Sequence, residues 1–341
     1  MIYIRNFKGW LASLVFLVGF IVVKFILPTD EATPYIHNQG EKFSTFYSVQ
    51  YESEQDFGVE IDLLLTKFNM SLSPFEQNSI ISAINSSDTP VVADKWLRDI
   101  IILSKEINKK TSGAFDPTIS PLINSWGFGF KQNKFPTDSD VKDMMSLVGM
   151  DKIELSDSGK VTKQNKDITL NFSAIAKGYA VDLVASLLKD NGVENYLVNI
   201  GGEIACNGVN EKGEEWRVGI DKPEESNISG DIHSVLSLSG KSLATSGNYR
   251  RFKEVEGQKV WHIIDPRTGY PTQARVLSAT VIADDCATAD AYATALMVLG
   301  VEEGMPIIEA DSTLEAMLIT SGDSAQYNLY YSSGFKNYLK R

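Results

Sequence analysis

The chain has 341 residues, of which 43% are hydrophobic and 22% charged, and its formal net charge is −12. These values are ordinary for a globular protein with one large domain or two modest ones. A negative chain without a basic stripe lacks the surface charge that nucleic acid requires, so we expect no nucleic-acid partner. The two cysteines, Cys206 and Cys286, are too few for a disulfide framework and do not form a CxxC pair.

The amino terminus predicts a targeting segment. Arg5 and Lys8 precede an uncharged run, 9–23, which continues past Lys24 to residue 27. This length roughly matches the hydrocarbon layer of a membrane, and the preceding basic residues favour a cytoplasmic N-terminus. No lipidation cysteine or clear cleavage site follows, which favours an uncleaved anchor over a cleaved signal peptide. The predicted organisation is a cytoplasmic end at 1–8, a transmembrane anchor or signal segment at 9–27, a linker at 28–40 and an exported domain at 41–341.

The domain mixes strand-like alternation with helical spacing of apolar residues. Helices are predicted at 58–70, 95–110, 137–148, 173–189, 287–299 and 302–310. Strands are predicted at 43–51, 153–155, 168–172, 196–200, 216–220, 232–238, 259–264, 278–282, 316–320 and 326–331. The strands come in runs and not in regular β-α-β units. This pattern predicts an α+β fold, a single domain of mixed or antiparallel sheets packed with helices.

One predicted helix carries a candidate metal site. Asp290 and Thr294 are four residues apart, so both oxygen-bearing side chains project from one helix face. Magnesium is commonly held by one or two carboxylates together with substrate phosphates. The same spacing also occurs on ordinary solvated helices. The alanines that alternate along this helix admit a bulky ligand or, more simply, tight helix packing.

Two further segments could bind an anion. Gly201 and Gly202 follow an apolar strand, where glycines let backbone amides approach a pyrophosphate, although a plain turn explains them equally well. Ser173 is predicted to cap the helix that contains Lys177, and the start of a helix attracts anions. Ordinary capping is the alternative there.

His262 is the candidate general base. It lies at a predicted strand end and is one of three histidines, and an imidazole can accept a proton near neutral pH. A structural histidine is the common alternative. Thr245 and Ser246 lie in a second glycine-containing segment that presents hydroxyl groups.

In chain order, these segments resemble the ApbE family, the FAD:protein FMN transferases. The resemblance covers about residues 37–340. It is carried by eight segments: 43–45, 73–85, 114–118, 171–182, 201–203, 245–249, 262–269 and 288–300.

The resemblance implies roles for particular residues. Magnesium is expected at Asp290, Thr294 and the backbone carbonyl of Ala174, with the carbonyl of Ala293 as a further candidate. His262 is expected to be the base. The residues expected at the FAD site are Phe43, Ala114, Phe115, Asp116, Asn171, Lys177, Gly201, Gly202, Thr245, Ser246 and Ile264.

The implied reaction is attack by a Ser or Thr hydroxyl of a target protein on the FMN phosphorus of FAD, with release of AMP. The implied targets are membrane redox subunits, and the implied location is the periplasmic side of a bacterial inner membrane. Two alternatives remain open: a magnesium-dependent FAD pyrophosphatase that yields FMN and AMP, and a non-catalytic anchored FAD-binding protein.

The chain departs from the family pattern at three places. Asn171 stands where many relatives have an aspartate, which removes one formal charge near the expected metal. Phe43-Ser44-Thr45 replaces a common Met-Gly-Thr, and the lipidation cysteine of many relatives is missing. Cys286, four residues before Asp290, is either a core residue or a redox-sensitive neighbour of the metal.

Overall fold

The computed structural model describes residues 33–128, 135–223, 231–248, 252–255, 258–261, 263–272, 276–322 and 327–340. The chain divides into a short N-terminal unit, 1–35, and a large unit, 36–341. The predicted anchor at 9–27 lies outside the described residues. The following description concerns the large unit.

An eight-stranded sheet organises the large unit, with the strand order β1-β2-β6-β7-β10-β13-β14-β15. Each neighbouring pair from β2 to β15 is antiparallel. The strands are β1 (Tyr35–Lys42), β2 (Thr45–Glu52), β6 (Tyr196–Ile200), β7 (Glu203–Asn207), β10 (Lys241–Gly247), β13 (Val276–Ala283), β14 (Glu315–Ser321) and β15 (Tyr327–Tyr331).

Smaller sheets flank this one. They are a three-stranded sheet and two hairpins: β3 (Val91–Val92), β5 (Lys160–Lys163) and β4 (Ile153–Leu155); β8 (Trp216–Asp221) and β9 (Ile232–Leu238); β11 (Phe252–Val255) and β12 (Gln258–Trp261). The described helices are α2 (Gly58–Leu72), α3 (Ile80–Ser86), α4 (Lys95–Lys110), α5 (Ser120–Ser125), α6 (Asp138–Met145), α7 (Ala176–Asp190) and α8 (Cys286–Glu309).

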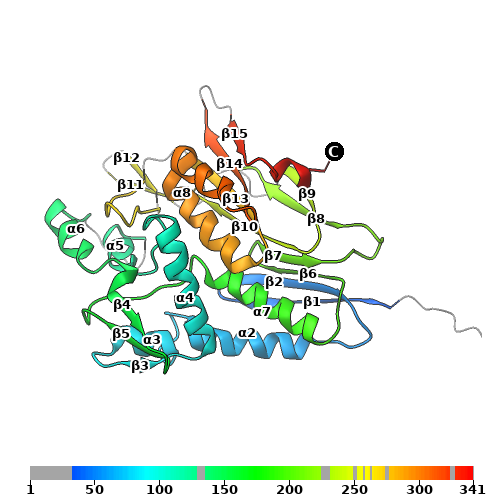
Figure 1. Cartoon of the computed structure of the whole chain (residues 1–341), viewed down its shortest axis with the longest axis horizontal. Coiled ribbons are helices and arrows are strands. Elements are labelled where there is room, and N and C mark those ends of the chain that lie inside the picture. The colour runs from blue at the N-terminus through cyan, green and yellow to red at the C-terminus, as the bar shows by residue number, and fades with distance from the viewer. Residues whose placement is uncertain are drawn as a thin grey trace, which may run out of the picture. The chain divides into compact units, whose positions relative to one another are not determined.

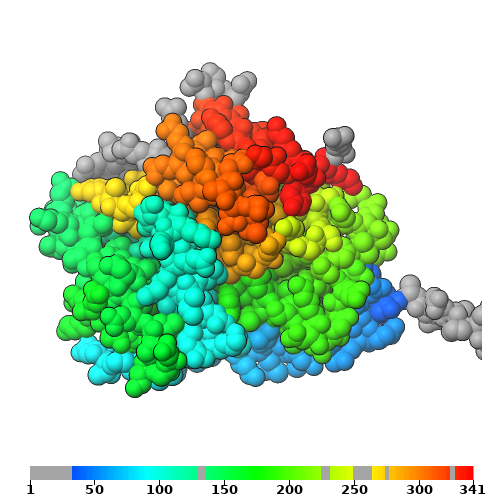
Figure 2. Space-filling view, viewed as in Figure 1, coloured from blue at the N-terminus to red at the C-terminus, as the bar shows by residue number. Residues whose placement is uncertain are grey.

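Two helices lie directly on the large sheet, α7 against β6 and β7 and α8 against β10 and β13 (Figure 1). α2 and α4 pack outside them, α2 on α7 and α4 on α8, and Figure 2 shows α4 (cyan) beside α8 (orange) at the surface. Alternate residues of β2, Tyr47, Val49 and Tyr51, are buried in the core, as strand geometry requires. The α+β architecture predicted from sequence is therefore confirmed.

The start of α7 packs closely against the start of α8, where small residues occur in both helices. Gly178 in α7 lies against the start of α8, and a Cβ added there would come within 2.2 Å of the carbonyl oxygen of Cys286. Ala287, Ala289, Ala291, Ala293 and Ala295 are all at most 1% exposed. Small side chains therefore allow the two helix backbones to approach closely at this point.

Several predicted elements need correction. Residues 168–172 do not form a strand, because the side chain of Asn85 donates to the carbonyl of Leu170 (2.9 Å) and accepts from its amide (2.7 Å), in place of a neighbouring strand. α7 begins at Ala176 and not at Ser173, and no side chain caps it. The strands β3, β5, β7, β10 and β11 and the helices α3 and α5 were not predicted, and residues 35–40 of β1 were assigned to a linker.

Among the described residues, one helix is long and apolar enough to cross a membrane by length and composition. It is α8, and 56% of its most apolar window is buried inside the protein. Core helices pass the same test, and α8 packs on the large sheet.

Candidate active site

The candidate metal site lies where the first turn of α7 meets α8. Asp290 is 4% exposed, and its Oδ2 accepts a hydrogen bond from the backbone N–H of Gly178 at 3.1 Å. This amide lies in the first turn of α7, where backbone N–H groups have no partner within the helix, and Asp290 supplies one. Ala174 precedes Ile175, the N-cap residue, so its carbonyl lies outside the hydrogen-bond ladder of the helix. A carboxylate and a carbonyl oxygen are both ligands that magnesium prefers.

Burial raises the pKa of Asp290, while the charge of Lys177 and the Gly178 amide act in the opposite direction. A cation that binds the second oxygen of this buried carboxylate would stabilise its charged form. Among the described residues, no group of three or more His, Cys, Asp or Glu side chains could hold a metal ion. A cation at Asp290 would therefore depend on carbonyl, hydroxyl and phosphate oxygens as its other ligands.

Thr294 lies one turn beyond Asp290, and its hydroxyl is 3.2 Å from the hydroxyl of Ser246 in β10. The structure thus brings together two predicted residues from distant parts of the chain. Thr245, the neighbour of Ser246, instead pairs with Thr280 across the sheet at 3.0 Å. Ala293 is fully buried within α8, where its carbonyl belongs to the helical ladder. It is therefore a weaker candidate ligand than Ala174.

Lys177 completes a charged cluster at the start of α7. Its ammonium forms an ion pair with Oε1 of Glu203, the first residue of β7. Burial raises the pKa of Glu203 to about 7, the nearby charge of Asp290 adds to the increase, and Lys177 acts against it. Burial lowers the pKa of Lys177, but the charges of Asp290 and Glu203 raise it by more, so the pKa is raised overall. The residues so far described can hold a cation at Asp290 and a phosphate beside Lys177.

Gly201 and Gly202 form the two-residue turn between β6 and β7. Both have positive φ, 67° and 104°, a conformation that glycine adopts without strain. The Gly201 amide donates to the carbonyl of Phe46 at 3.0 Å, and the Gly202 amide donates to Asn199 Oδ1 at 3.0 Å. Both amides are therefore used within the protein. A cavity of about 630 Å³ opens beside this turn, lined also by residues of β1 and β2.

Phe43 and Ser44 form the turn between β1 and β2, and both have positive φ, 56° and 58°. The ring of Phe43 packs edge-on against Phe68, with ring centroids 5.8 Å apart. Non-glycine residues in this conformation are strained. The side chain of Phe43 is partly buried against the main core.

The segment Ala114, Phe115 and Asp116 is buried, with exposures of 1%, 2% and 8%. Both oxygens of Asp116 have partners: Oδ1 accepts from the Thr118 amide at 2.8 Å, and Oδ2 accepts from Asn108 Nδ2 at 3.1 Å. Burial raises the pKa of Asp116, against these hydrogen bonds. The Asp116 side chain thus shapes the loop, and the role of the three residues toward FAD stays a prediction.

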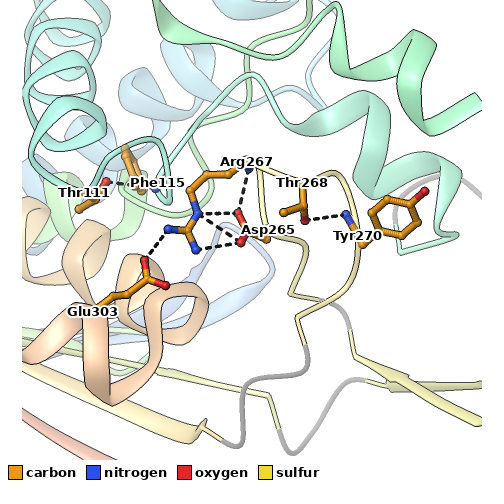
Figure 3. Close-up of polar contacts among 7 residues, drawn as sticks. All are labelled: Thr111, Phe115, Asp265, Arg267, Thr268, Tyr270 and Glu303. Atoms are coloured by element: carbon orange, nitrogen blue, oxygen red, sulfur yellow. Dashed lines mark hydrogen bonds and ion pairs between the residues drawn. The ribbon is translucent and has the colours of Figure 1, made fainter. Parts of the chain in front are cut away.

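The predicted base segment, 262–269, is described from residue 263 onward, as part of the loop 263–272. Figure 3 shows Arg267 between Asp265 and Glu303: its Nε is 3.0 Å from Asp265 Oδ1, and its Nη1 is 2.6 Å from Glu303 Oε2 in α8. The carbonyl of Gly269 accepts from the indole of Trp126 at 2.9 Å, and Ile264 is 4% exposed. His262 itself lies outside the described residues.

Asn171 lies three residues before Ala174. Its Oδ1 accepts from the Ser173 amide at 2.9 Å and from the Ser173 hydroxyl at 2.6 Å. The side chain therefore stabilises the turn that leads to Ala174. Ser173, predicted as the helix cap, is exposed and donates to this turn.

Cys286 has a structural position. It is fully buried, with Sγ 3.7 Å from the carbonyl of Leu243, and burial raises the pKa of its thiol well above the usual value. Cys206 is 2% exposed, and burial raises its pKa to about 12. Both are free thiols. Core packing, the first of the two alternatives for Cys286, fits these observations.

Two residues of this region were not singled out from the sequence. Glu203 stands at a buried strand position, and a carboxylate in an otherwise apolar strand is a signal that could have identified it. Asp182 accepts the amides of Cys286 (2.7 Å) and Ala287 (2.8 Å), so it caps α8 from the neighbouring helix. That contact depends on the packing of α7 on α8, and no local sequence pattern predicts it.

Comparison with known proteins shows the family of this chain. The model of the ApbE family matches residues 43–318. The chain belongs to the ApbE family. It is 33% identical to the FAD:protein FMN transferase of Vibrio cholerae, over 99% of this chain and 100% of that protein. It is also 33% identical to the FAD:protein FMN transferase of Haemophilus influenzae, over 90% and 92% of the two chains.

Solved structures of ApbE proteins share the fold. The flavin transferase ApbE of Vibrio cholerae superposes with a TM-score of 0.80 at 34% identity, over 90% of this chain and 99% of that one. The flavinyl transferase ApbE of Pseudomonas stutzeri, in its apo form, gives a TM-score of 0.80 at 28% identity, over 89% and 96%. The Vibrio cholerae protein has also been solved as a variant in which a histidine is replaced by glycine.

Proposed function

We propose that this chain is a magnesium-dependent FAD:protein FMN transferase that attaches FMN through a phosphoester bond to a Ser or Thr hydroxyl of a target protein. The activity named for its relatives supports the reaction. The buried carboxylate of Asp290 carries the argument for the metal, because its Oδ2 binds the Gly178 amide at the start of α7, four residues after Ala174, whose carbonyl lies outside the helical ladder. Asp290, Thr294 and this carbonyl would then hold magnesium.

In the proposed reaction, the hydroxyl oxygen of the target attacks the FMN phosphorus. The bond from this phosphorus to the bridging oxygen breaks, and AMP leaves with that oxygen. Magnesium would supply the positive charge that offsets the growing charge on the phosphates. Lys177 would bind the same phosphates from the start of α7, and His262 would accept the hydroxyl proton.

We further propose that segment 9–27 anchors the protein in a bacterial inner membrane, with the enzyme domain on the periplasmic side. The proposal rests on the basic residues before the apolar run and on the length of that run. Targets on that side would be redox proteins that carry FMN covalently, such as subunits of membrane electron-transfer complexes.

The decisive experiment mixes the purified protein with FAD, magnesium and a candidate target domain, and measures the intact mass of the target. A magnesium-dependent increase equal to FMN is expected. Free FMN and AMP without an adduct on any target would show a pyrophosphatase instead. Intact FAD throughout would favour a flavin-binding protein without catalysis.

A further inference from the structure

The position of Lys177 is unfavourable for a lysine. It lies in the first turn of α7, where the helix dipole repels cations. Its side chain is 33% exposed, whereas that of its ion-pair partner, Glu203, is 4% exposed. A partly exposed lysine side chain is thus paired with a buried carboxylate.

Glu203 has little other use in the fold. Its Oε1 binds Lys177, and its buried Oε2 has no hydrogen-bond partner among the described residues. Structural carboxylates in this protein differ from it, since Asp182 and Asp116 bind backbone amides with their oxygens. Glu203 therefore does not join two backbone segments through its side chain.

Stability does not explain a pair of this kind. Taking a carboxylate out of water costs free energy, and the attraction of one partner often only offsets this cost. An exposed pair such as Lys110 and Glu106, 3.0 Å apart, carries no comparable cost. A buried carboxylate with one charged partner is better explained by what it does to that partner.

The backbone around Glu203 fixes its direction. The turn at Gly201 and Gly202 requires positive φ at both residues, and it delivers Glu203 into the buried start of β7. Asp290 lies close enough to Glu203 and Lys177 for its charge to affect both. The Lys177 ammonium thus lies near two buried carboxylates, Glu203 and Asp290, and Asp290 belongs to the candidate metal site.

We propose that Glu203 is a positioning residue: it holds the Lys177 ammonium toward the phosphates of FAD beside Asp290. Glu203 acts through Lys177 and does not itself contact FAD. This inference rests on the proposed function and adds a residue that sets the affinity for FAD.

The test is a double-mutant cycle of Glu203→Gln and Lys177→Gln, with the dissociation constant for FAD, from flavin fluorescence, and kcat and KM as readouts. Loss of a charge-assisted contact corresponds to an effect of about 10- to 100-fold. We expect Glu203→Gln to weaken FAD binding and raise KM by about 10-fold. Because Glu203 acts through Lys177, the double variant should bind FAD no more weakly than Lys177→Gln alone.

Glu203→Asp is the conservative variant, which keeps the charge and should recover part of the lost affinity. Glu106→Gln, at the exposed partner of Lys110, is the matched control and should leave FAD binding unchanged. Thermal unfolding of each variant separates a local effect from loss of the fold.

Two results would overturn the inference. One is wild-type FAD affinity in a folded Glu203→Gln protein. The other is a double variant in which the two single effects multiply, which would mean that Glu203 acts independently of Lys177. Failure of the proposed function looks different, because the unmodified protein would then transfer no FMN to a target, whatever its affinity for FAD.

Discussion

Asp290 is the residue on which the proposed metal site depends most, because it is the buried carboxylate of the set. Asp290→Asn keeps the size of the side chain and an oxygen that can accept from Gly178, but removes the charge. We expect the rate of magnesium-dependent FMN transfer to fall at least about 100-fold, as expected when a metal ligand with several kcal/mol of charge stabilisation is lost. Transfer is measured by intact mass of the target.

Asp285→Asn is a suitable control for this change. Asp285 lies in the cap of the same helix, where its side chain accepts from the Thr288 amide at 2.8 Å, outside the candidate site. The control should transfer FMN normally. An Asp290→Asn protein with unchanged magnesium dependence would contradict the metal assignment.

Asn171 offers the opposite experiment, a gain of charge. An aspartate at this position can accept the same two bonds from Ser173, and it adds a negative charge close to Ala174. We expect Asn171→Asp to lower the magnesium concentration for half-maximal transfer by about threefold, through a charge interaction of about 0.6 kcal/mol near the surface. The measurement is a magnesium titration of the transfer rate.

Asn165→Asp is the matched control, since Asn165 accepts from the Asp167 amide in the same type of turn at 2.9 Å. Its titration should coincide with that of the unmodified protein. An unchanged midpoint for Asn171→Asp would show that this position does not sense the metal.

At this scale the sequence predicted several residues that the structure brings together, and their roles stay predictions. Asp290 and Thr294 follow from helical spacing, and the structure adds Ser246 beside Thr294. What the sequence could not give was the bond from Gly178 to Asp290, since it joins residues 112 positions apart through the packing of two helices. Glu203 lies in the segment 201–203 that carries the family resemblance, but its ion pair with Lys177 is likewise a product of tertiary structure.

The crossing of α7 and α8 leads to a prediction about elements. Gly178→Ala would place a Cβ 2.2 Å from the Cys286 carbonyl oxygen, which belongs to backbone and cannot move aside alone. We expect a loss of about 3 kcal/mol in the free energy of unfolding, the upper part of the usual range for overpacking. Denaturant unfolding measures it.

Ser186→Ala, on the exposed side of α7, tests whether alanine in this helix is harmful in itself. It should be neutral or slightly stabilising, because alanine has the best helix propensity. A Gly178→Ala protein as stable as this control would mean that the helices separate at little cost.

The loop 263–272 is the second element whose stabilising contacts can be tested by substitution. Lysine cannot reproduce the planar, multiple contacts that Arg267 makes with Asp265 and Glu303 in Figure 3. Because the loop follows His262 directly in the chain, we expect Arg267→Lys to slow FMN transfer several-fold, with a loss of stability of about 1 kcal/mol.

Arg217→Lys changes a half-exposed arginine that pairs with Glu214 at 2.7 Å on the surface, and it should affect neither quantity. A normal transfer rate in Arg267→Lys would show that the loop holds its position without the arginine.

Predicted elements agree with the structure where local sequence determines them, and differ from it where contacts with distant residues do. α4 agrees with the predicted helix 95–110 over its full length, and the structure shows local determinants for it: buried residues at helical spacing and a start capped by Asp94. The segment 168–172 has strand composition, yet the distant Asn85 satisfies its backbone. β7 and β10 were missed because their residues read as turns beside glycines, and their pairing is a long-range property.

For the whole molecule, the proposed anchor predicts where the protein is found. The full chain should sediment with membranes and be digested by protease added to the periplasmic side. A chain without residues 1–28 should remain soluble. A soluble full-length product shortened at its N-terminus would show instead that the segment is a cleaved signal peptide.

The fold class was predictable because runs of strands separated by helices exclude a doubly wound sheet, and the structure confirms an α+β fold. The strand order was not predictable. β10 lies between β7 and β13, which brings Ser246 to α8, and no local pattern in the sequence specifies that neighbour.

The two buried cysteines give the molecule a built-in reporter. In the native state neither thiol is accessible, and both have raised pKa values, so alkylating reagents should react with them only after the core has opened. Cys206 lies in the large sheet and Cys286 at the start of α8. The order in which the two become labelled would therefore reveal whether sheet and helix separate together or in steps, without any engineered probe.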